Sequence, residues 1–588
     1  IERALEMEPE LKQAYKEDSE TKEIIDLAKK LEGNARHIGV HAAGVVIAPQ
    51  PVIEYAPLQP DPRGGKMITQ YNMYSIADEY GGVGLLKFDF LGLKNLAVLA
   101  DSIKRVKKIH GKEIDADNMP LDDEKTFKML SDGHTMGVFQ MASAGMTRYL
   151  MELKPTTIHD INAMVALYRP GPMEFIPDYI ARKRDPSKVK YIDSRMEKYL
   201  KPTFGILIYQ DDVMSIAVEL AGYSWGEADK FRKAMGKKIP ELMAEQKDKF
   251  FRGCLEGGMN DKSAQQLWDM IETFAAYGFN KSHSVSYGNL AYKTAYMKAN
   301  YPLEFMSSLL TADSGNIDTI SEIIEECKAM NIEILPPDVN ESYEVFAVVP
   351  NERQIRFGLD SIKNFGTNVS HQIVEERKAN GPYKDITDFL ERVRSSGMNR
   401  RGLESLIQSG ALDRFASRGR LLKNIEILLE FQKEMNKKPE GQDSLFGLSE
   451  SSSALTLFDA KDVSQKQKLA WEKELLGLYV SGHPLEAYAK KLEGRPGISD
   501  VKTKQREGMV TVIAGIISEN KTILTKNGEK MSFIRIADLE DSIEAVAFPR
   551  VLTEHGELLG IDTCVLLKGR ISNRNDEKSF IIEAVRAL

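Results

Sequence analysis

The chain has 588 residues, a hydrophobic content of 42%, a charged content of 28% and a formal net charge of −8. This length predicts about four domains with substantial cores, and the composition is typical of a globular protein. A membrane protein is excluded, because no apolar run approaches the roughly 20 residues that span a bilayer. Because the chain is acidic overall, nucleic acid would have to bind at local basic patches.

The cysteines indicate the redox environment of the chain, and the first residue bears on whether the sequence is a fragment. Cys254, Cys327 and Cys564 lie far apart, which excludes a disulfide framework and a cysteine-based zinc site, and they predict a reducing cytoplasm. The chain starts at Ile1 and shows no signal-peptide pattern. We therefore expect a fragment whose true beginning is missing.

The first ninety residues change from helical to strand-like. Residues 1–36 are charged and carry an apolar stripe, which predicts surface helix. From Gly44 the runs GVVIAP, MITQYNM and GLLKFDF, separated by Pro- and Gly-rich loops, predict a small sheet. His37 and His41 have helical spacing, but the strand-like AAGVVIAP that follows them argues against a metal site.

The stretch 84–96, GLLKFDFLGLKNL, predicts a buried strand that ends at a glycine before a helix. Strand side chains alternate, so Leu85, Lys87 and Asp89 share one face. A buried Lys and Asp require a partner, a metal or a substrate, or else they pair with each other. Both interpretations, a structural ion pair and a functional site, stay open at this point.

The region from Gly92 to about residue 335 is predicted to be helical, and it carries two phosphate-directed candidates. The stretch 228–252 has eight basic and four acidic residues, a local balance of +4, and Arg232, Lys237 and Lys238 flank a glycine break. A phosphate can approach backbone N–H groups closely at such a break. The alternative is a solvated helical face.

The second candidate starts the helix predicted at 278–302. Its first residues are Asn280, Lys281, Ser282 and His283, where the free N–H groups and the helix dipole favour an anion. The tyrosines that follow at helical spacing are interpreted as core. No P-loop, nucleophile elbow or HExxH motif occurs, so those enzyme classes are unsupported.

The C-terminal half predicts three further parts. Residues 355–415 resemble a helix, a glycine-bearing hairpin at Asn364-Phe365-Gly366 and a second helix, which can offer N–H groups to a DNA phosphate, or simply form a helical hairpin. Residues 434–468 predict a mobile linker with exposed apolar anchors. From Gly508, alternating strands with a turn at Lys526-Asn527-Gly528 fit an OB-type barrel that could bind single strands.

The order of these pieces resembles the C-family replicative DNA polymerases, the bacterial DNA polymerase III alpha subunits. The resemblance covers essentially the whole chain. It is carried by LLKFDFLGLKNL, HIGVHAAGVVI, GVFQM, VALYRPGPM, FGILIYQDDVM, FRKAMGKK, YGFNKSHSVSYG and WEKELLGLYVSGHPL, and by QDSLF, which is similar to an internal sliding-clamp-binding motif.

The resemblance implies a role for each cluster. Asp89 matches a palm carboxylate that holds Mg²⁺ or positions the primer 3′-hydroxyl, and Lys87 matches a palm lysine that faces the triphosphate. The implied nucleotide-binding residues are Tyr168, Arg169, Arg232, Lys237, Lys238, Asn280, Lys281, Ser282 and His283. The implied clamp-binding residues are Gln442, Asp443, Leu445 and Phe446. Two Mg²⁺ ions about 3.5–4 Å apart are expected in a complete site of this kind.

The same resemblance implies a multidomain α+β fold with a mixed palm sheet remnant, mainly helical fingers, a helix-hairpin-helix module and a C-terminal OB-type barrel. The implied boundaries are the helical end of a thumb at 1–44, the palm remainder at 45–95, fingers at 96–350, a helix-hairpin-helix and clamp-binding region at 351–433, a linker with the clamp motif and a helical segment at 434–507, and an OB-fold domain at 508–588.

The chain departs from the family pattern in one respect. The family's other two palm carboxylates lie in an Asp-x-Asp motif upstream of Asp89, and no such motif precedes Asp89 here. IDADN at 114–118 lies on the wrong side. We therefore expect the chain to begin near the end of the thumb and to be unable to polymerise alone.

The implied function is template-directed DNA synthesis in the bacterial cytoplasm. The implied partners are primer–template DNA, deoxynucleoside triphosphates, the sliding clamp, and the clamp-loader and proofreading subunits, without a membrane. Two alternatives are a translesion paralogue of the same family and a non-catalytic adaptor that binds DNA and clamp. QDSLF favours the replicative form over the paralogue, and the strand with Lys87 and Asp89 has no purpose in an adaptor.

Overall fold

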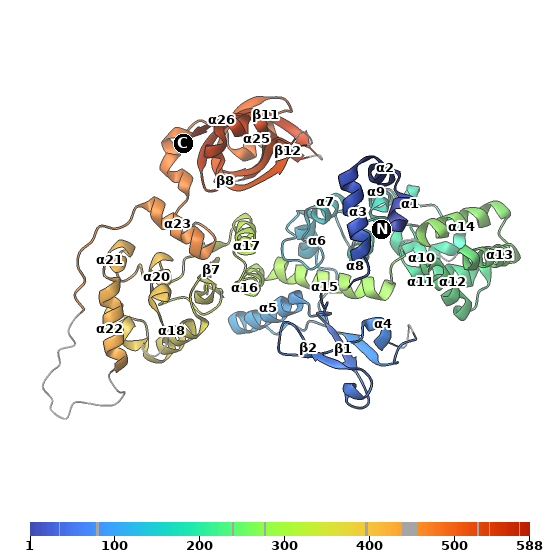
Figure 1. Ribbon diagram of the computed structural model, residues 1–588, viewed down its shortest axis with the longest axis horizontal. Helices are drawn as coiled ribbons and strands as arrows, with labels where there is room; N and C mark the ends of the chain where they lie inside the picture. The colour runs from blue at the N-terminus through green and yellow to red at the C-terminus, as the bar shows by residue number, and fades with distance from the viewer. Residues whose placement is uncertain are drawn as a thin grey trace. The chain divides into compact units, whose positions relative to one another are not determined.

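A computed structural model gives the fold of the chain (Figure 1). It describes residues 1–34, 36–77, 81–237, 240–275, 278–393, 398–437, 455–525, 528–539, 541–574 and 577–588. The chain separates into two compact units, Ile1–Leu93 and Lys94–Leu588, and each is described by itself. Among the described residues, no helix combines the length and the apolar character needed to cross a membrane.

Among its described residues, the first unit has four α-helices and two small antiparallel sheets. Its elements are α1 (Glu2–Met7), α2 (Pro9–Glu17), α3 (Ser19–Leu31), β1 (Gly44–Ile47), β2 (Leu58–Pro60), β3 (Met67–Thr69), α4 (Met73–Ile76) and β4 (Leu86–Asp89). Asp18 caps α3 by accepting hydrogen bonds from the N–H groups of Glu20 and Thr21. β1 pairs with β4, and β2 pairs with β3. We expected a mixed sheet, but the described strands of this unit pair only in antiparallel fashion.

The core of the first unit is small, and this corrects one expectation. Among the residues described in this unit, Ala56, Ile76 and Leu85 form one small buried cluster. β4 is largely exposed, with Phe88 and Leu86 facing solvent. The prediction of a buried strand was therefore wrong, because apolar residues become buried only where another layer covers them, and a two-stranded sheet offers little cover.

The second unit starts with a large helical region, as predicted. Its helices are α5 (Lys94–His110), α6 (Glu124–Ser131), α7 (Ala144–Leu153), α8 (Ile158–Leu167), α9 (Ile176–Arg184), α10 (Glu197–Leu200), α11 (Gln210–Ala221), α12 (Trp225–Lys237), α13 (Pro240–Glu256), α14 (Asp261–Ala275), α15 (Lys281–Asn300), α16 (Pro302–Ala312) and α17 (Ile317–Ala329). The long helix α15 packs against α5, α6, α8 and α16 (Figure 1). Helices α11 to α14 close around a separate aromatic core that contains Phe231, Phe250 and Trp268.

A second helical part follows a three-stranded sheet. The elements are β5 (Glu333–Leu335), β6 (Ala347–Val348), β7 (Gln354–Arg356), α18 (Thr367–Asn380), α19 (Ile386–Arg392), α20 (Arg400–Gln408), α21 (Arg418–Lys423), α22 (Ile425–Lys437), α23 (Gln465–Leu476), α24 (Ala489–Leu492) and α25 (Ile498–Lys504). This part shares one continuous core with α5, α16 and α17. Buried Arg418 pairs with Glu472 at 2.9 Å and so joins α21 to α23.

The linker predicted at 434–468 is wrong at both of its described ends. Helix α22 continues to Lys437, and Leu455 and Leu457 pack against the core of the second unit. The side chain of Asn424 bonds both the N–H and the carbonyl oxygen of Phe458, at 2.9 Å each. Leu455 and Leu457 of this polar segment are therefore packed against a hydrophobic core, which composition alone could not reveal.

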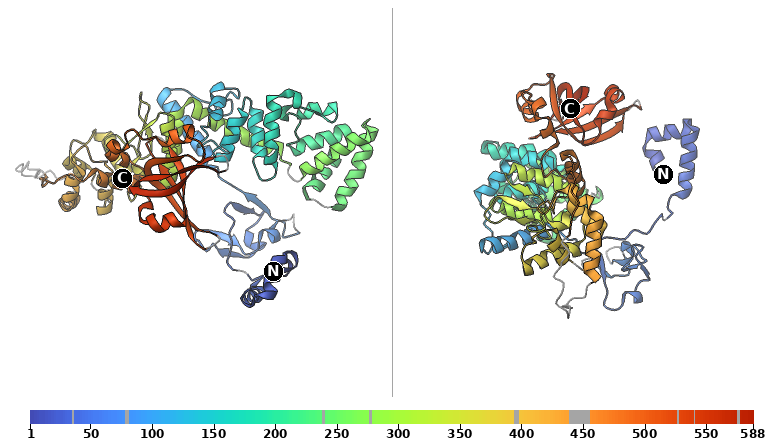
Figure 2. Two further views of the ribbon diagram at one scale, coloured as in Figure 1. Left: turned by 90° about the horizontal axis from the view of Figure 1, so that it is seen from above. Right: turned by 90° about the vertical axis from the view of Figure 1, so that its left-hand side faces the viewer.

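The C-terminal strands form the closed five-stranded barrel that the alternating pattern predicted (Figure 2). Its elements are β8 (Val510–Leu524), β9 (Lys530–Ala537), β10 (Ser542–Ala547), α26 (Pro549–His555), β11 (Cys564–Arg574) and β12 (Glu577–Ala587). The strand order is β10-β12-β11-β8-β9, closed by pairing of β9 with β10. At the register shift beside Gly569, a Cβ atom would lie 2.0 Å from the Ile581 carbonyl oxygen, so only glycine fits this bend.

Candidate functional site

Lys87 and Asp89 form an exposed ion pair on β4. The Lys87 ammonium lies 2.5 Å from Oδ1 of Asp89, and their side chains are 19% and 45% exposed. The shared face predicted for these residues is confirmed, and Phe88 and Phe90 stack on the opposite face. A hydrogen bond from Lys87 lowers the pKa of Asp89, which keeps this carboxylate ionised. The pair is not buried, so a buried structural ion pair does not describe it.

A histidine and a glycine complete the surroundings of this pair. Nδ1 of His41 lies 3.8 Å from Oδ1 of Asp89. Gly44 pairs with Asp89 across the sheet, and a Cβ there would lie 3.2 Å from Cε of Lys87 and 3.0 Å from Nδ1 of His41. His37 and His41 lie outside any helix, which agrees with the strand-like run that follows them in the sequence. Gly44 leaves room for the side chains of Lys87 and His41.

The start of α15 is built as the sequence predicted. Asn280 is the N-cap, and its Oδ1 accepts hydrogen bonds from the N–H of His283 at 2.9 Å and from the hydroxyl of Ser282 at 2.7 Å. The helix then runs for 20 residues. Its dipole favours an anion at this end.

Two aspartates that are not among the predicted site residues bind the start of α15. The backbones of Tyr209 and Phe279 form a parallel bridge, which brings the first residues of α11 beside those of α15. Oδ2 of Asp211 accepts the N–H of Lys281 at 2.9 Å, and Oδ1 of Asp212 lies 2.8 Å from the Lys281 ammonium. The signal was the adjacent acidic pair in the motif FGILIYQDDVM, but its partner lies about seventy residues away in the sequence.

Arg169 joins the same cluster through a stack of rings. Its guanidinium lies 4.4 Å from the ring centre of Phe279, which lies 5.5 Å from His283, which lies 4.2 Å from Tyr287. Partial burial lowers the pKa of Arg169, although an arginine stays charged. Tyr168 precedes Arg169 and packs edge-on against Tyr149 at 6.1 Å. Tyr168, Arg169 and 280–283 therefore occupy neighbouring elements.

The basic stretch on α12 gives a mixed outcome. Gly236 lies inside α12, so the predicted break at this glycine is wrong. The apolar residues Phe231 and Ala234 are buried and extend the helix through the glycine. Arg232 pairs with Asp229 at 2.9 Å on its own helix, so its described contacts do not join it to the α15 cluster. Lys237 ends the helix, and Lys238 lies outside the described residues.

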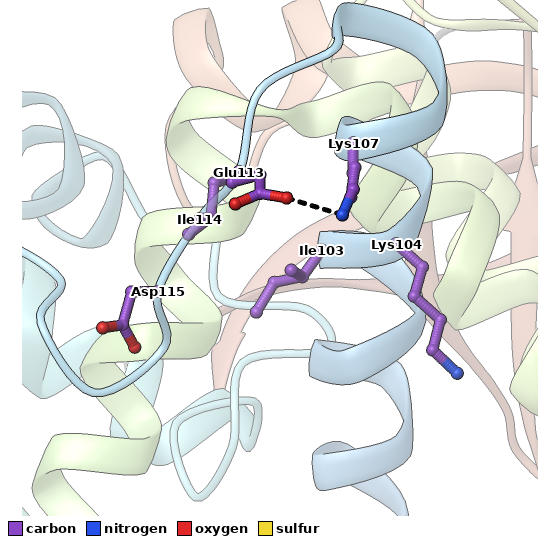
Figure 3. A pocket seen from close by; sticks show the side chains of 6 residues that line it. All are labelled: Ile103, Lys104, Lys107, Glu113, Ile114 and Asp115. Carbon is purple, nitrogen blue, oxygen red and sulfur yellow. Dashed lines mark hydrogen bonds and ion pairs between the residues drawn. The ribbon is translucent and has the colours of Figure 1, made fainter.

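The IDADN sequence occupies the loop after α5. Asp115 accepts hydrogen bonds from the backbone N–H of Asp117 at 2.9 Å and from the Asn118 side chain at 2.7 Å. A cavity of about 250 Å³ lies beside this loop, and the Lys107–Glu113 pair spans 2.6 Å at its edge (Figure 3). Its lining residues are Ile103, Lys104, Lys107, Glu113, Ile114 and Asp115. These carboxylates make local turns and belong to a different unit from Asp89.

The other candidates lie in the C-terminal half. The predicted hairpin keeps Asn364 in the left-handed region at φ +65°, immediately before α18. A short 3-10 turn rather than a full helix precedes this hairpin. Gln442, Asp443, Leu445 and Phe446 lie outside the described residues, as do Lys526 and Asn527 of the barrel turn. Among the described residues, one group of three potential metal ligands is Glu344, His371 and Glu375, which is largely exposed.

The comparisons with known proteins agree with this arrangement. Four family models match: the bacterial DNA polymerase III alpha NTPase domain at 1–92, its finger domain at 95–258, a helix-hairpin-helix motif at 331–421 and an OB-fold nucleic acid binding domain at 511–588. Curated relatives named DNA polymerase III subunit alpha are 40% identical in Thermus aquaticus, 40% in Aquifex aeolicus and 38% in Bacillus subtilis. These alignments cover 100%, 98% and 100% of this chain, and 48%, 48% and 52% of the relatives.

A helix-hairpin-helix module and an OB barrel together define the class of DNA-binding proteins. Within this class, the chain belongs to the bacterial DNA polymerase III alpha family, as the resemblance in its motifs implied. The chain spans about half the length of the curated relatives it matches.

Proposed function

We propose that this chain is the fingers, DNA-binding and partial palm portion of a bacterial replicative DNA polymerase, which transfers a nucleotide to a primer 3′-hydroxyl in the cytoplasm. The observation that carries this proposal is the start of α15, where Lys281 and His283 follow the N-cap Asn280 and Arg169 is joined to them through the ring of Phe279. Such a cluster suits the phosphates of a deoxynucleoside triphosphate.

The fingers residues act on the phosphates in this proposal. The Lys281 ammonium and the Arg169 guanidinium stabilise negative charge on the triphosphate and on the departing pyrophosphate. The ring of Phe279 orients Arg169 by stacking at 4.4 Å. Arg232, Lys237, Lys238, Tyr168 and Ser282 complete the proposed nucleotide-binding set. Because Lys281 and Arg169 are held before the substrate arrives, they need little rearrangement during the reaction.

Asp89 is the proposed catalytic carboxylate, with Lys87 beside it. An ionised, half-exposed carboxylate is an oxygen ligand of the kind that Mg²⁺ prefers. When bound in polymerases, two such ions activate the 3′-oxygen and neutralise the leaving group. Asp89 fits as one ligand, but the described residues around it, Lys87 and His41, do not supply the others. Asp89 therefore acts on the primer 3′-hydroxyl only when further carboxylates complete the metal site.

The proposed partners follow from the remaining modules. The hairpin before α18 and the barrel bind primer–template DNA, and the barrel's basic residues suit a single strand. Gln442, Asp443, Leu445 and Phe446 bind the sliding clamp, and the clamp-loader and proofreading subunits are the expected neighbours in the holoenzyme. The domain boundaries given above remain proposals of the same standing, apart from the linker, whose described ends are packed or helical.

A non-catalytic adaptor is the second candidate, because the chain contains one palm carboxylate and complete DNA-binding modules. The two candidates differ in nucleotide binding. A fluorescent deoxynucleotide should bind the purified chain, and Lys281→Ala should weaken binding about tenfold by removing one charge-assisted contact. Lys262→Ala, on the exposed start of α14, is the control and should bind normally. An equal affinity in both variants would favour the adaptor.

A further inference from the structure

A buried carboxylate lies directly behind the cation at the start of α15. The Asp212 side chain is 3% exposed and its Oδ1 lies 2.8 Å from the Lys281 ammonium, whose side chain is 43% exposed. Oδ2 of Asp212 is also buried and has no hydrogen-bond donor among the described residues. One side of the ammonium is thus held by a buried anion, while the lysine side chain also reaches solvent.

Other contacts already fix the position of Lys281. Its N–H donates to Asp211 at 2.9 Å, and its ammonium lies 5.4 Å from the ring centre of Tyr209. The bridge between Tyr209 and Phe279 holds the two segments in register. The charge of Asp212 is therefore not required to bring Lys281 to this place, and its electrostatic effect needs a separate explanation.

A buried anion beside a phosphate-directed cation weakens the attraction of that cation for phosphate. Charges interact strongly where water is excluded, and a buried carboxylate is screened less by salt than an exposed one. An anion that binds Lys281 is attracted by the ammonium. It is also repelled by the Asp212 carboxylate, whose Oδ1 lies 2.8 Å from that ammonium. The pocket consequently holds any phosphate less tightly than Lys281 alone would.

We propose that Asp212 weakens the attraction of the Lys281 ammonium for phosphate, so that the pocket accepts the phosphates of a nucleotide yet releases inorganic pyrophosphate. This rests on the proposed function of the α15 cluster and adds a residue to it. Asp212 touches neither substrate nor reacting atoms, so it is a positioning residue that sets the charge offered by Lys281. Asp211, which binds the backbone N–H of the same lysine, fixes the helix start.

Acid should relax this effect. Burial raises the pKa of Asp212, so its negative charge is lost at a higher pH than for an ordinary carboxyl. Affinity for phosphate then increases as the pH falls through that pKa. The groups that face the pair are Lys281, Asp211 and Tyr209, with His283 on the first turn of α15. His283 is a further ionisable side chain at this helix start, so its contribution must be removed by comparison.

Calorimetric titration of the whole chain with inorganic pyrophosphate, without magnesium, tests the proposal. Asp212→Asn keeps an acceptor for Lys281 and removes the charge. We expect it to bind pyrophosphate about tenfold more tightly than the wild type, as Coulomb's law at an effective dielectric of about 20 allows after screening. Glu272→Gln, at an exposed residue of α14, is the matched control and should leave the affinity unchanged.

Two comparisons separate the possible failures. If Lys281→Ala binds pyrophosphate as tightly as the wild type, the proposed nucleotide pocket fails, and this inference with it. If Lys281→Ala weakens binding but Asp212→Asn does not strengthen it, the inference alone is overturned. Absence of binding by both the wild type and Asp212→Asn also overturns it.

The pH dependence of the affinity for pyrophosphate provides a second measurement. A purely structural ion pair would leave this pH dependence unchanged. In a His283→Asn background, affinity for pyrophosphate should increase more steeply toward acid with Asp212 than with Asn at 212. Pyrophosphate's own protonation is common to both proteins and cancels in the difference. If Asp212→Asn fails to fold, the His283→Asn variant is measured alone. Its affinity for pyrophosphate must then change with pH in a way that the protonation of pyrophosphate does not explain. A pH profile that this protonation fully explains refutes the proposal.

Discussion

The start of α15 and the strand β4 both present a lysine paired with an aspartate, yet their surroundings differ. Asp212 is buried behind Lys281, within helices that share extensive cores. Asp89 is half-exposed on a two-stranded sheet with three buried apolar residues. The same two residue types therefore form a pair with a buried carboxylate in one region and a pair with a half-exposed carboxylate in the other.

This difference shows that a charged pair acquires its chemistry from what covers it. At Lys281, α11 supplies a second aspartate, and α15 itself supplies the N-cap and the neighbouring rings. At Asp89 the exposed faces of Leu86, Phe88 and Phe90 lack a covering layer within the described residues of the first unit. We interpret the first region as a ready phosphate site, and the second as one ligand of a site that needs further carboxylates.

The largest expected effect is at Asp89. In the complete parent polymerase, Asp89→Asn should reduce turnover by about a thousandfold or more, because a neutral amide is a poor metal ligand. Primer–template binding, measured by anisotropy, should remain nearly unchanged. An equal loss of turnover and DNA affinity would assign Asp89 a structural role and remove the contrast with Lys281.

The fingers should depend strongly on their own core. Trp268 is fully buried among Phe231 and Phe250, so Trp268→Ala should lower the free energy of unfolding by about 3–5 kcal/mol. Trp225 is exposed at the start of α12, and Trp225→Ala serves as the control. Denaturant unfolding followed by circular dichroism measures both. Similar costs for the two variants would contradict the packing described here.

A smaller effect concerns the proposed clamp contact. Phe446→Ala should weaken binding to the sliding clamp by about 2–4 kcal/mol, as loss of a buried anchor does. Phe458→Ala, at an exposed phenylalanine beyond the motif, should bind normally. Surface plasmon resonance with the clamp provides the measurement, and unchanged affinity for Phe446→Ala would refute the assignment.

The smallest effect is expected at Lys87. Lys87→Met should raise the pKa of Asp89 toward its usual value, because the hydrogen bond from Lys87 is what lowers it most. Since the folded-state pKa is lowered, any stabilisation by the pair is present near neutral pH and is lost in acid as Asp89 protonates. The pair is exposed, so the melting temperature should barely change. NMR titration of the Asp89 carboxyl measures the shift, and an unmoved pKa would mean that Lys87 does not act on it.

Local chemistry explains which features the sequence could predict. The barrel follows from strict alternation, and the start of α15 follows from Asn280 as an N-cap, because both signals lie within a few residues. The acidic partners of Lys281 required contact between distant segments, which a single sequence does not reveal. The exposure of β4 and the continuation of α12 through Gly236 were missed for the same reason, because tertiary packing decided them.

Primer extension by the purified 588-residue chain tests the central claim most directly. With primer–template, all four deoxynucleoside triphosphates and magnesium, the chain should bind the DNA and leave the primer unextended. This result is expected because Asp89 is the one proposed palm carboxylate that the chain contains. Measurable extension that Asp89→Asn abolishes would show that the chain supplies a complete catalytic site, and would contradict this account.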